Sequence, residues 1–137
     1  MHHKGLEELL IKHEGLRHHV YNDSLGIKTI GVGRNLESVG LSDEEIMFLL
    51  RNDIKRCKAE LMQFNWYFNQ PRNVQNALIN MCFNLGLTRL LGFKKMIKAL
   101  EEKNYTKAAL EALDSKWARQ VPERAKDIAV QIRETET

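Results

Sequence analysis

A short glycine-rich stretch between two helical patterns limits the folds that this chain can adopt. Residues 14–34 read EGLRHHVYNDSLGIKTIGVGR, in which strand-forming residues flank a turn rich in Asn, Asp, Ser and Gly. This pattern predicts a β-hairpin. Nearly all of the sequence from Ser42 onward has helical spacing of its apolar residues. The sequence therefore predicts an α+β protein that is mainly α, with one small N-terminal β-hairpin.

The second strand of this hairpin contains two glycines. We expect Thr29, Ile30 and Val32 to form the strand, which Gly31 and Gly33 interrupt. Glycine inside a strand weakens it, and it often marks a bulge or the close approach of another backbone or a ligand.

Helical patterns with clear ends lie on both sides of the hairpin. A first helix is expected over residues 4–13, because Gly15 can end it. Ser42 and Glu45 form a capping box that starts a long helix over about residues 43–63. The strongest helical pattern consists of Val74, Ala77, Leu78, Met81, Cys82 and Leu85. It predicts the central helix of a second core. Further helices are expected at about 93–102, 105–113 and 122–133.

The length of the chain limits its domain organisation. A chain of 137 residues suffices for one compact domain of two lobes, but not for two independent domains. We expect a single domain over residues 1–137. Its parts would be an N-terminal lobe at about 14–41, a connecting helix at about 43–63 and a helical lobe at about 64–133 that also includes helix 4–13.

Composition and charge narrow the class of protein. A hydrophobic content of 43% and a charged content of 28% are typical of globular proteins rather than disordered chains. No apolar run is long enough to span a bilayer, and no secretory signal is visible, so we expect no stable membrane insertion. The net charge of +3 suits an anionic partner, or simply solubility. No DNA or RNA motif is present, so we expect no nucleic-acid partner.

The two cysteines do not form a recognisable metal or redox motif. Cys57 and Cys82 make no CxxC pair and lack histidines at metal-ligand spacing. Both fall on apolar faces of expected helices, so we expect buried free thiols, with a disulfide as the alternative. The sequence indicates no metal and no organic cofactor.

Three residues of the hairpin segment are of the types that glycoside hydrolysis needs. That reaction uses one carboxyl group as an acid and a second, ionised one as nucleophile or base. Glu14 ends a helix, where backbone carbonyls disfavour negative charge, so it suits the acid. Asp23 lies in a turn whose N–H groups can hold its charge, and the Thr29 hydroxyl could hold a water. The alternative is a solvated helix end, a turn former and an ordinary strand residue.

The spacing of these residues resembles the phage-type lysozymes, the endolysin muramidases of glycoside hydrolase family 24. The family has a glutamate in an E-G-x-R context, an aspartate nine residues on, and a threonine six residues further in T-I-G-x-G. This sequence has Glu14, Asp23 and Thr29 at those positions. The resemblance extends to ALINMCFNLG (77–86), Gly92-Phe93 and SKWARQVPERA (115–125).

The resemblance implies a lysozyme-like fold and a muramidase that cleaves the β-1,4 bond between N-acetylmuramic acid and N-acetylglucosamine in peptidoglycan. It assigns Glu14 as catalytic acid, Asp23 as catalytic carboxylate and Thr29 as the hydroxyl that positions water, which favours inversion. The substrate would lie between the two lobes. Positions that match substrate-binding residues of the family are Leu36, Phe83, Asn84 and Arg124. Phe83 could instead be a packed core aromatic, and Arg124 a solvated helix-start residue.

The resemblance also implies a biological role and leaves two alternatives. We expect a monomer that is made in the bacterial host cytoplasm and reaches the cell wall through a holin-type pore, causing host lysis. A lytic transglycosylase and a non-catalytic peptidoglycan-binding protein are the alternatives.

Arg34 departs from the family pattern, because many relatives have histidine after T-I-G-x-G. A histidine gains or loses its charge near neutral pH, whereas an arginine stays positively charged. The stretch from Arg34 to Ser42 is also short, which predicts a reduced hairpin lobe.

Overall fold

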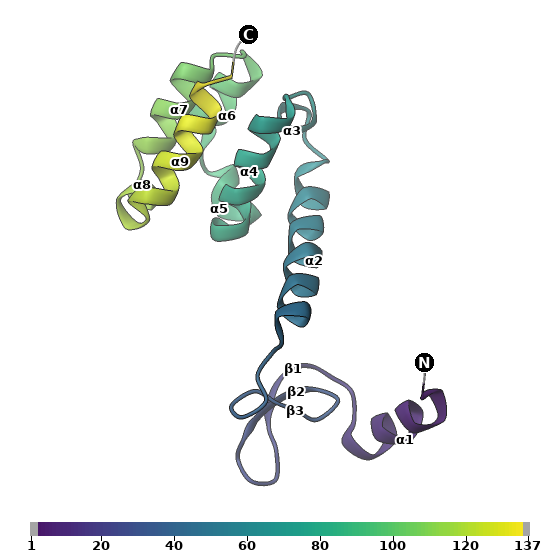
Figure 1. Ribbon diagram of the computed structural model, residues 1–137. Coiled ribbons are helices and arrows are strands. Elements are labelled where there is room, and N and C mark those ends of the chain that lie inside the picture. Colours follow the sequence, from purple (N-terminus) through teal and green to yellow (C-terminus); the bar gives the residue numbers. More distant parts are fainter. Residues whose placement is uncertain (1–2, 136–137) are drawn as a thin grey trace. The chain divides into compact units, whose positions relative to one another are not determined.

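The computed structural model describes residues 3–135, which are mostly helical with one small antiparallel sheet (Figure 1). The expected α+β, mainly α fold is therefore confirmed. The chain divides into two compact units, and the boundary falls between Phe48 and Leu49. The expected assignment of helix 4–13 to the helical lobe stays a prediction.

The first unit contains one helix, a three-stranded sheet and the start of a long helix. Its elements are α1 (Lys4–Glu14), β1 (Arg17–Asn22), β2 (Lys28–Gly31), β3 (Arg34–Asn35) and the first residues of α2 (Asp43–Leu61). The strands pair antiparallel in the order β1-β2-β3, so β2 is the central strand. Thr29 on β2 faces Tyr21 of β1 and Asn35 of β3.

The third strand differs from the sequence-based expectation. We expected the second strand to continue to Val32, but β2 ends at Gly31 and the chain returns as β3 from Arg34. Gly31 has a φ of +70° and Gly33 a φ of +65°, in the left-handed region that favours glycine. The two glycines therefore flank a tight turn instead of interrupting one strand.

The second unit is helical. It contains the rest of α2, then α3 (Asn65–Phe68), α4 (Arg72–Leu85), α5 (Leu87–Leu91), α6 (Lys94–Glu101), α7 (Tyr105–Leu113), α8 (Lys116–Gln120) and α9 (Pro122–Arg133). The expected helices agree with α2, α6, α7 and α9 within two residues at each end. Helix α7 packs against α6 and α9, and α4 packs against α9.

Helix α4 supplies the centre of this core, as its apolar spacing predicted. All six residues of the pattern are buried: Val74, Ala77, Leu78, Met81, Cys82 and Leu85. Full burial of a large aliphatic side chain contributes about 1.5–3 kcal/mol. Both cysteines are free and buried, as expected. Burial, with smaller contributions from Cys57 and Glu60, raises the pKa of the Cys82 thiol to about 12.

One polar side chain, Gln70, is buried in the core and joins three elements. Its Nε2 donates to Trp66 O at 2.9 Å and to Leu100 O at 3.0 Å. Its Oε1 accepts a hydrogen bond of 2.7 Å from the Tyr105 hydroxyl. Another buried tyrosine, Tyr67, has a hydroxyl with no hydrogen-bond partner within residues 3–135.

This difference between the two tyrosines predicts opposite effects of the same substitution. Tyr105→Phe leaves the buried Gln70 Oε1 without a donor, so we expect it to lower the free energy of unfolding by about 1–3 kcal/mol. Tyr67→Phe removes a hydroxyl that is already unpaired, so we expect no loss and even a small gain. Denaturant unfolding of the two variants measures both effects. Equal losses would contradict this account of the Gln70 contacts.

Candidate active site

Glu14 is the last residue of α1, and its carboxyl group lies against the turn between β2 and β3. Gly15, with a φ of +82°, ends the helix, and its N–H donates to Ile11 O at 2.8 Å. A Cβ built on Gly33 would lie 2.8 Å from Glu14 Oε1 and 3.2 Å from Glu14 Cδ. Because any side chain at position 33 would collide with this carboxyl group, glycine there permits the close approach of helix end and turn.

Asp23 lies in the loop between β1 and β2, where backbone N–H groups hold its side chain. Its Oδ1 accepts hydrogen bonds from Leu25 N at 2.8 Å and from Ile27 N at 2.9 Å. Its own N–H donates to Ile27 O at 3.0 Å. Because both side-chain bonds go to Oδ1, the turn does not need Oδ2. Oδ2 is therefore the oxygen of Asp23 that remains for another partner.

Thr29 is buried on the central strand and bonds to the same residue as Asp23. Its Oγ1 donates to Ile27 O at 2.8 Å, and its exposed fraction is 3%. Ile27 thus donates its N–H to Asp23 and accepts from Thr29, which ties both side chains to one peptide segment. Glu14 lies at the other end of the four-residue β2, so all three predicted catalytic residues are attached to one small sheet.

The contact between Gly33 and Glu14 gives a mutational prediction. An alanine at position 33 must displace the Glu14 carboxyl group, because the side chain is the movable partner. A displacement of about 1 Å can cost roughly 10²-fold in rate, so we expect Gly33→Ala to lower kcat/KM on peptidoglycan by about that factor. The measurement is initial rate against substrate concentration.

Gly31→Ala is the matched control for this variant. Gly31 lies beside the same turn with a similar positive φ, but a Cβ on it would meet no atom within 4 Å. Both variants should lose about 1–2 kcal/mol of stability from backbone strain. Only Gly33→Ala should also lose activity in the folded state. A similar activity for both variants would mean that Gly33 does not position Glu14.

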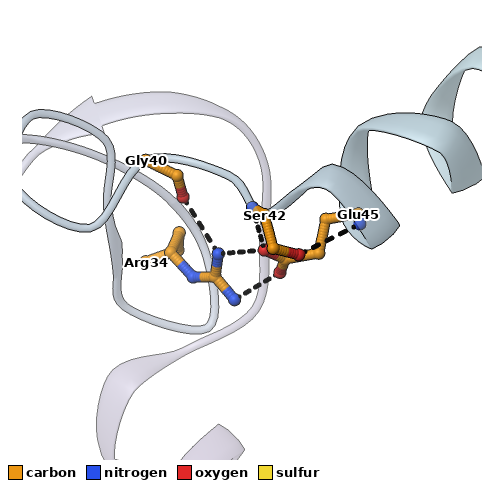
Figure 2. A network of polar contacts seen from close by, with 4 residues as sticks. All are labelled: Arg34, Gly40, Ser42 and Glu45. Carbon is orange, nitrogen blue, oxygen red and sulfur yellow. Dashed lines mark hydrogen bonds and ion pairs between the residues drawn. The ribbon is translucent and has the colours of Figure 1, made fainter.

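Arg34 anchors the loop after β3 to the first turn of α2 (Figure 2). It donates to Glu45 Oε1 at 2.9 Å, to Glu45 Oε2 at 2.5 Å and to Gly40 O at 3.0 Å. Glu45 also accepts from Ser42 N at 2.8 Å, and its own N–H donates to Ser42 Oγ at 3.1 Å. The predicted capping box is therefore present, and the same glutamate also forms a bidentate ion pair.

These contacts change the acid–base properties of the pair. The hydrogen bond from Arg34, followed by the one from the Ser42 backbone, lowers the pKa of Glu45 from 4.5 to about 2. Glu45 in turn raises the pKa of Arg34 above its ordinary value. Because the folded state lowers the pKa of Glu45, the ion pair stabilises the fold fully above pH 4.5. This stabilisation is lost as the pH falls from 4.5 to about 2.

Glu45→Gln separates the ion pair from the capping box. A glutamine can still accept the Ser42 N–H, as in other capping boxes, but it cannot form the charged pair. We expect the variant to be less stable than the unchanged protein at pH 7, with a smaller decrease in melting temperature between pH 4.5 and 2. Thermal unfolding across this range measures the difference. Parallel curves would exclude Glu45 as the titrating group.

Of the four predicted substrate-binding residues, Leu36 lies in the first unit, and Phe83, Asn84 and Arg124 lie in the second. Leu36 is half-buried, and its N–H donates to Lys28 O at 2.9 Å. Phe83 is 43% exposed, so it is not part of the core of its unit. Asn84 Oδ1 accepts from Trp117 Nε1 at 2.8 Å, and Arg124 is half-buried in the first turn of α9. Their contact with substrate stays a prediction.

The second unit also has a cavity that the sequence did not predict. Its volume is about 570 Å³, and it is lined by Leu85, Arg89, Gly92, Phe93, Lys94, Lys95, Met96, Glu111, Asp114, Ser115, Lys116 and Trp117. Four of these side chains are cationic and two are acidic. The buried Trp117 ring contacts Phe93 edge to face at 6.0 Å and bonds to Asn84. Clustered lysines near aromatic residues were the available sequence signal.

The small sheet therefore holds a helix-ending glutamate, a turn aspartate and a buried threonine, the types of side chain that a glycosidase uses. Residues 11–135 match the phage lysozyme family, and the chain belongs to this family. Two proteins of Dictyostelium discoideum, named probable T4-type lysozyme 2 and 1, are 27% and 26% identical to it. Each alignment covers 97% of this chain and 95% of the relative. The expected enzyme class, a lysozyme acting on peptidoglycan, is thus confirmed.

Proposed function

We propose that this lysozyme hydrolyses the β-1,4 bond between N-acetylmuramic acid and N-acetylglucosamine, with Glu14 as the proton donor. The observation that carries the proposal is the place of the Glu14 carboxyl group, whose Oε1 lies 2.8 Å from where a Cβ on Gly33 would be. It fixes an exposed carboxyl group at a helix C-terminus beside a glycine turn. A carboxyl group held there can serve as the general acid that protonates the leaving glycosidic oxygen.

Asp23 and Thr29 would act on the water that attacks the sugar. Thr29 Oγ1 gives its own proton to Ile27 O, so its free lone pair can accept a hydrogen bond from water. A water held in this way keeps its own lone pair available for the anomeric carbon. The ionised Asp23 carboxylate, through Oδ2, can accept the proton that this water loses. The arrangement supports inversion, in which a water separates the second carboxylate from the sugar.

The cavity of the second unit suits the peptide that muramic acid carries. Such peptide stems contain free carboxylates, and Arg89, Lys94, Lys95 and Lys116 line the cavity. Arg124, half-buried at the start of α9, supplies another cation in the same unit. We propose that Arg124 binds substrate, as do Leu36, Phe83 and Asn84.

The proposed biological role is lysis of a bacterial host by a monomeric endolysin. The family description supports a phage origin for this type of enzyme. Among residues 3–135, no helix combines the length and the apolar character needed to cross a bilayer. We propose that the enzyme accumulates in the host cytoplasm and needs a holin-type pore to reach the wall. Lysis on expression without any such pore would contradict this route.

Product analysis of digested peptidoglycan tests the reaction itself. Hydrolysis should give muropeptides with a reducing N-acetylmuramic acid end, each heavier by one water than the corresponding anhydro product. Proton NMR at early times should show the α-anomer, because inversion of a β-linkage produces it. Anhydro-muramic ends would instead identify a lytic transglycosylase, and an initial β-anomer would identify retention. Absence of cleavage with retained binding would identify a peptidoglycan-binding protein.

A further inference from the structure

Two buried thiols and a carboxylate meet between α2 and α4 in the second unit. Cys57 and Glu60 lie three positions apart on α2, which places them on one face of the helix. Cys82 faces them from α4. Three possible ligand atoms lie within 4.8 Å of one another: the two cysteine Sγ atoms and a carboxylate oxygen of Glu60. The cluster is therefore already assembled from two helices of the second unit.

We propose that Cys57, Glu60 and Cys82 bind a Zn²⁺ ion, with a water as the fourth ligand. Thiolates and carboxylates are common zinc ligands, with bonds of about 2.3 Å to sulfur and about 2.0–2.2 Å to oxygen. In a tetrahedron, such bonds place the ligand atoms roughly 3.5–3.8 Å apart. The ligand atoms lie within 4.8 Å of one another, so binding requires them to approach by at most about 1 Å.

The types of ligand in the cluster suit a soft divalent cation. Both sulfurs are buried, so thiolates there would be unstable without a positive charge beside them. Glu60 is half-buried, so the cluster is partly open to solvent on the side of this residue. Binding forms two Zn–S bonds and releases the two thiol protons to solvent. Thiolate ligands select zinc over magnesium and calcium, which prefer all-oxygen sites.

The ion would cross-link α2 to the central core helix of the second unit. Because the sites on α2 and α4 come together only in the folded state, zinc should bind the folded protein in preference to the unfolded chain. Its melting temperature should then rise with zinc concentration. This stabilising role is separate from the proposed hydrolysis, which involves no metal.

Cobalt titration of the full-length, reduced and chelator-treated protein tests the site. Co²⁺ should bind one ion per chain and give the sulfur-to-cobalt charge-transfer and visible bands of a tetrahedral thiolate site. Zn²⁺ should then remove these bands. Glu60→Gln should weaken binding by at least about tenfold, whereas Glu101→Gln, an exposed glutamate on α6, should not. Cys82→Ala should abolish the charge-transfer bands.

Several results would overturn the proposal. One is the absence of charge-transfer bands at cobalt concentrations well above that of the protein, and another is their survival in a folded Cys82→Ala variant. If cysteine variants do not fold, equal affinities of the Glu60→Gln and Glu101→Gln variants would exclude the site. Isolation of the protein with a Cys57–Cys82 disulfide, two hydrogens lighter and without free thiols, would assign the pair to redox chemistry instead.

Discussion

Replacing Glu14 with glutamine is expected to lower the rate of peptidoglycan hydrolysis by about 10²–10⁴-fold, the usual contribution of a general acid. Glutamine has the same shape, so it can occupy the same place against Gly33. It has no acidic proton to give to the leaving glycosidic oxygen. Turbidity loss of outer-membrane-permeabilised Gram-negative cells, and product release from purified peptidoglycan, measure the decrease.

Stability separates this chemical effect from a structural one. Because Glu14 is exposed at the negative end of α1, its neutral replacement should leave the melting temperature unchanged or slightly higher. Glu7→Gln, in the first turn of the same helix, is the matched control and should keep full activity. Near wild-type lysis by a folded Glu14→Gln variant would refute Glu14 as the acid.

Replacing Asp23 with asparagine should lower the same rate by about 10²–10⁴-fold while preserving the turn. The Oδ1 atom of asparagine can accept the Leu25 and Ile27 N–H groups just as the carboxylate oxygen does. The substitution therefore removes the charge and keeps the local hydrogen bonds. An aspartate that only stabilises the turn would make the same hydrogen bonds. The substitution is therefore needed to separate a catalytic role of the charge from a structural role of the bonds.

A second variant at this position completes the test. Asp23→Ala removes Oδ1, which accepts both hydrogen bonds of the turn. It should therefore lower the activity and also the melting temperature. An active Asp23→Asn enzyme together with an inactive, destabilised Asp23→Ala enzyme would show that Asp23 only forms the turn. Steady-state rates and thermal unfolding of both variants distinguish these outcomes.

The parts of the fold that depend on nearby residues were predictable from the sequence. Gly15 ends α1 and the Ser42–Glu45 capping box starts α2, because a helix end depends on groups within one turn of it. The buried face of α4 was predictable since apolar spacing reports which side of a helix meets the core. The resemblance of the Glu14, Asp23 and Thr29 pattern to the lysozyme family indicated the reaction, although the roles of these residues stay predictions.

Features that depend on backbone conformation and on packing appeared only in the tertiary structure. The strand β3 and the turn before it depend on pairing and on positive φ values at Gly31 and Gly33, which no propensity specifies. The expected strand through Val32 was wrong for this reason. The contact of Gly33 with Glu14 likewise depends on how α1 packs on the turn, because periodicity gives the face of an element but not its neighbour.

The sequence alone determined the fold class, the helix ends and the candidate catalytic side chains, because these follow from local periodicity, capping and spacing. The tertiary structure decided what these side chains contact. It placed Arg34 against Glu45, so the charge of Arg34 is used in an ion pair with the first turn of α2. It also brought Cys82 beside Cys57, which sequence spacing could not reveal because the ligands come from two helices. Such contacts depend on how whole helices and strands pack against one another. Short sequence patterns do not specify this packing.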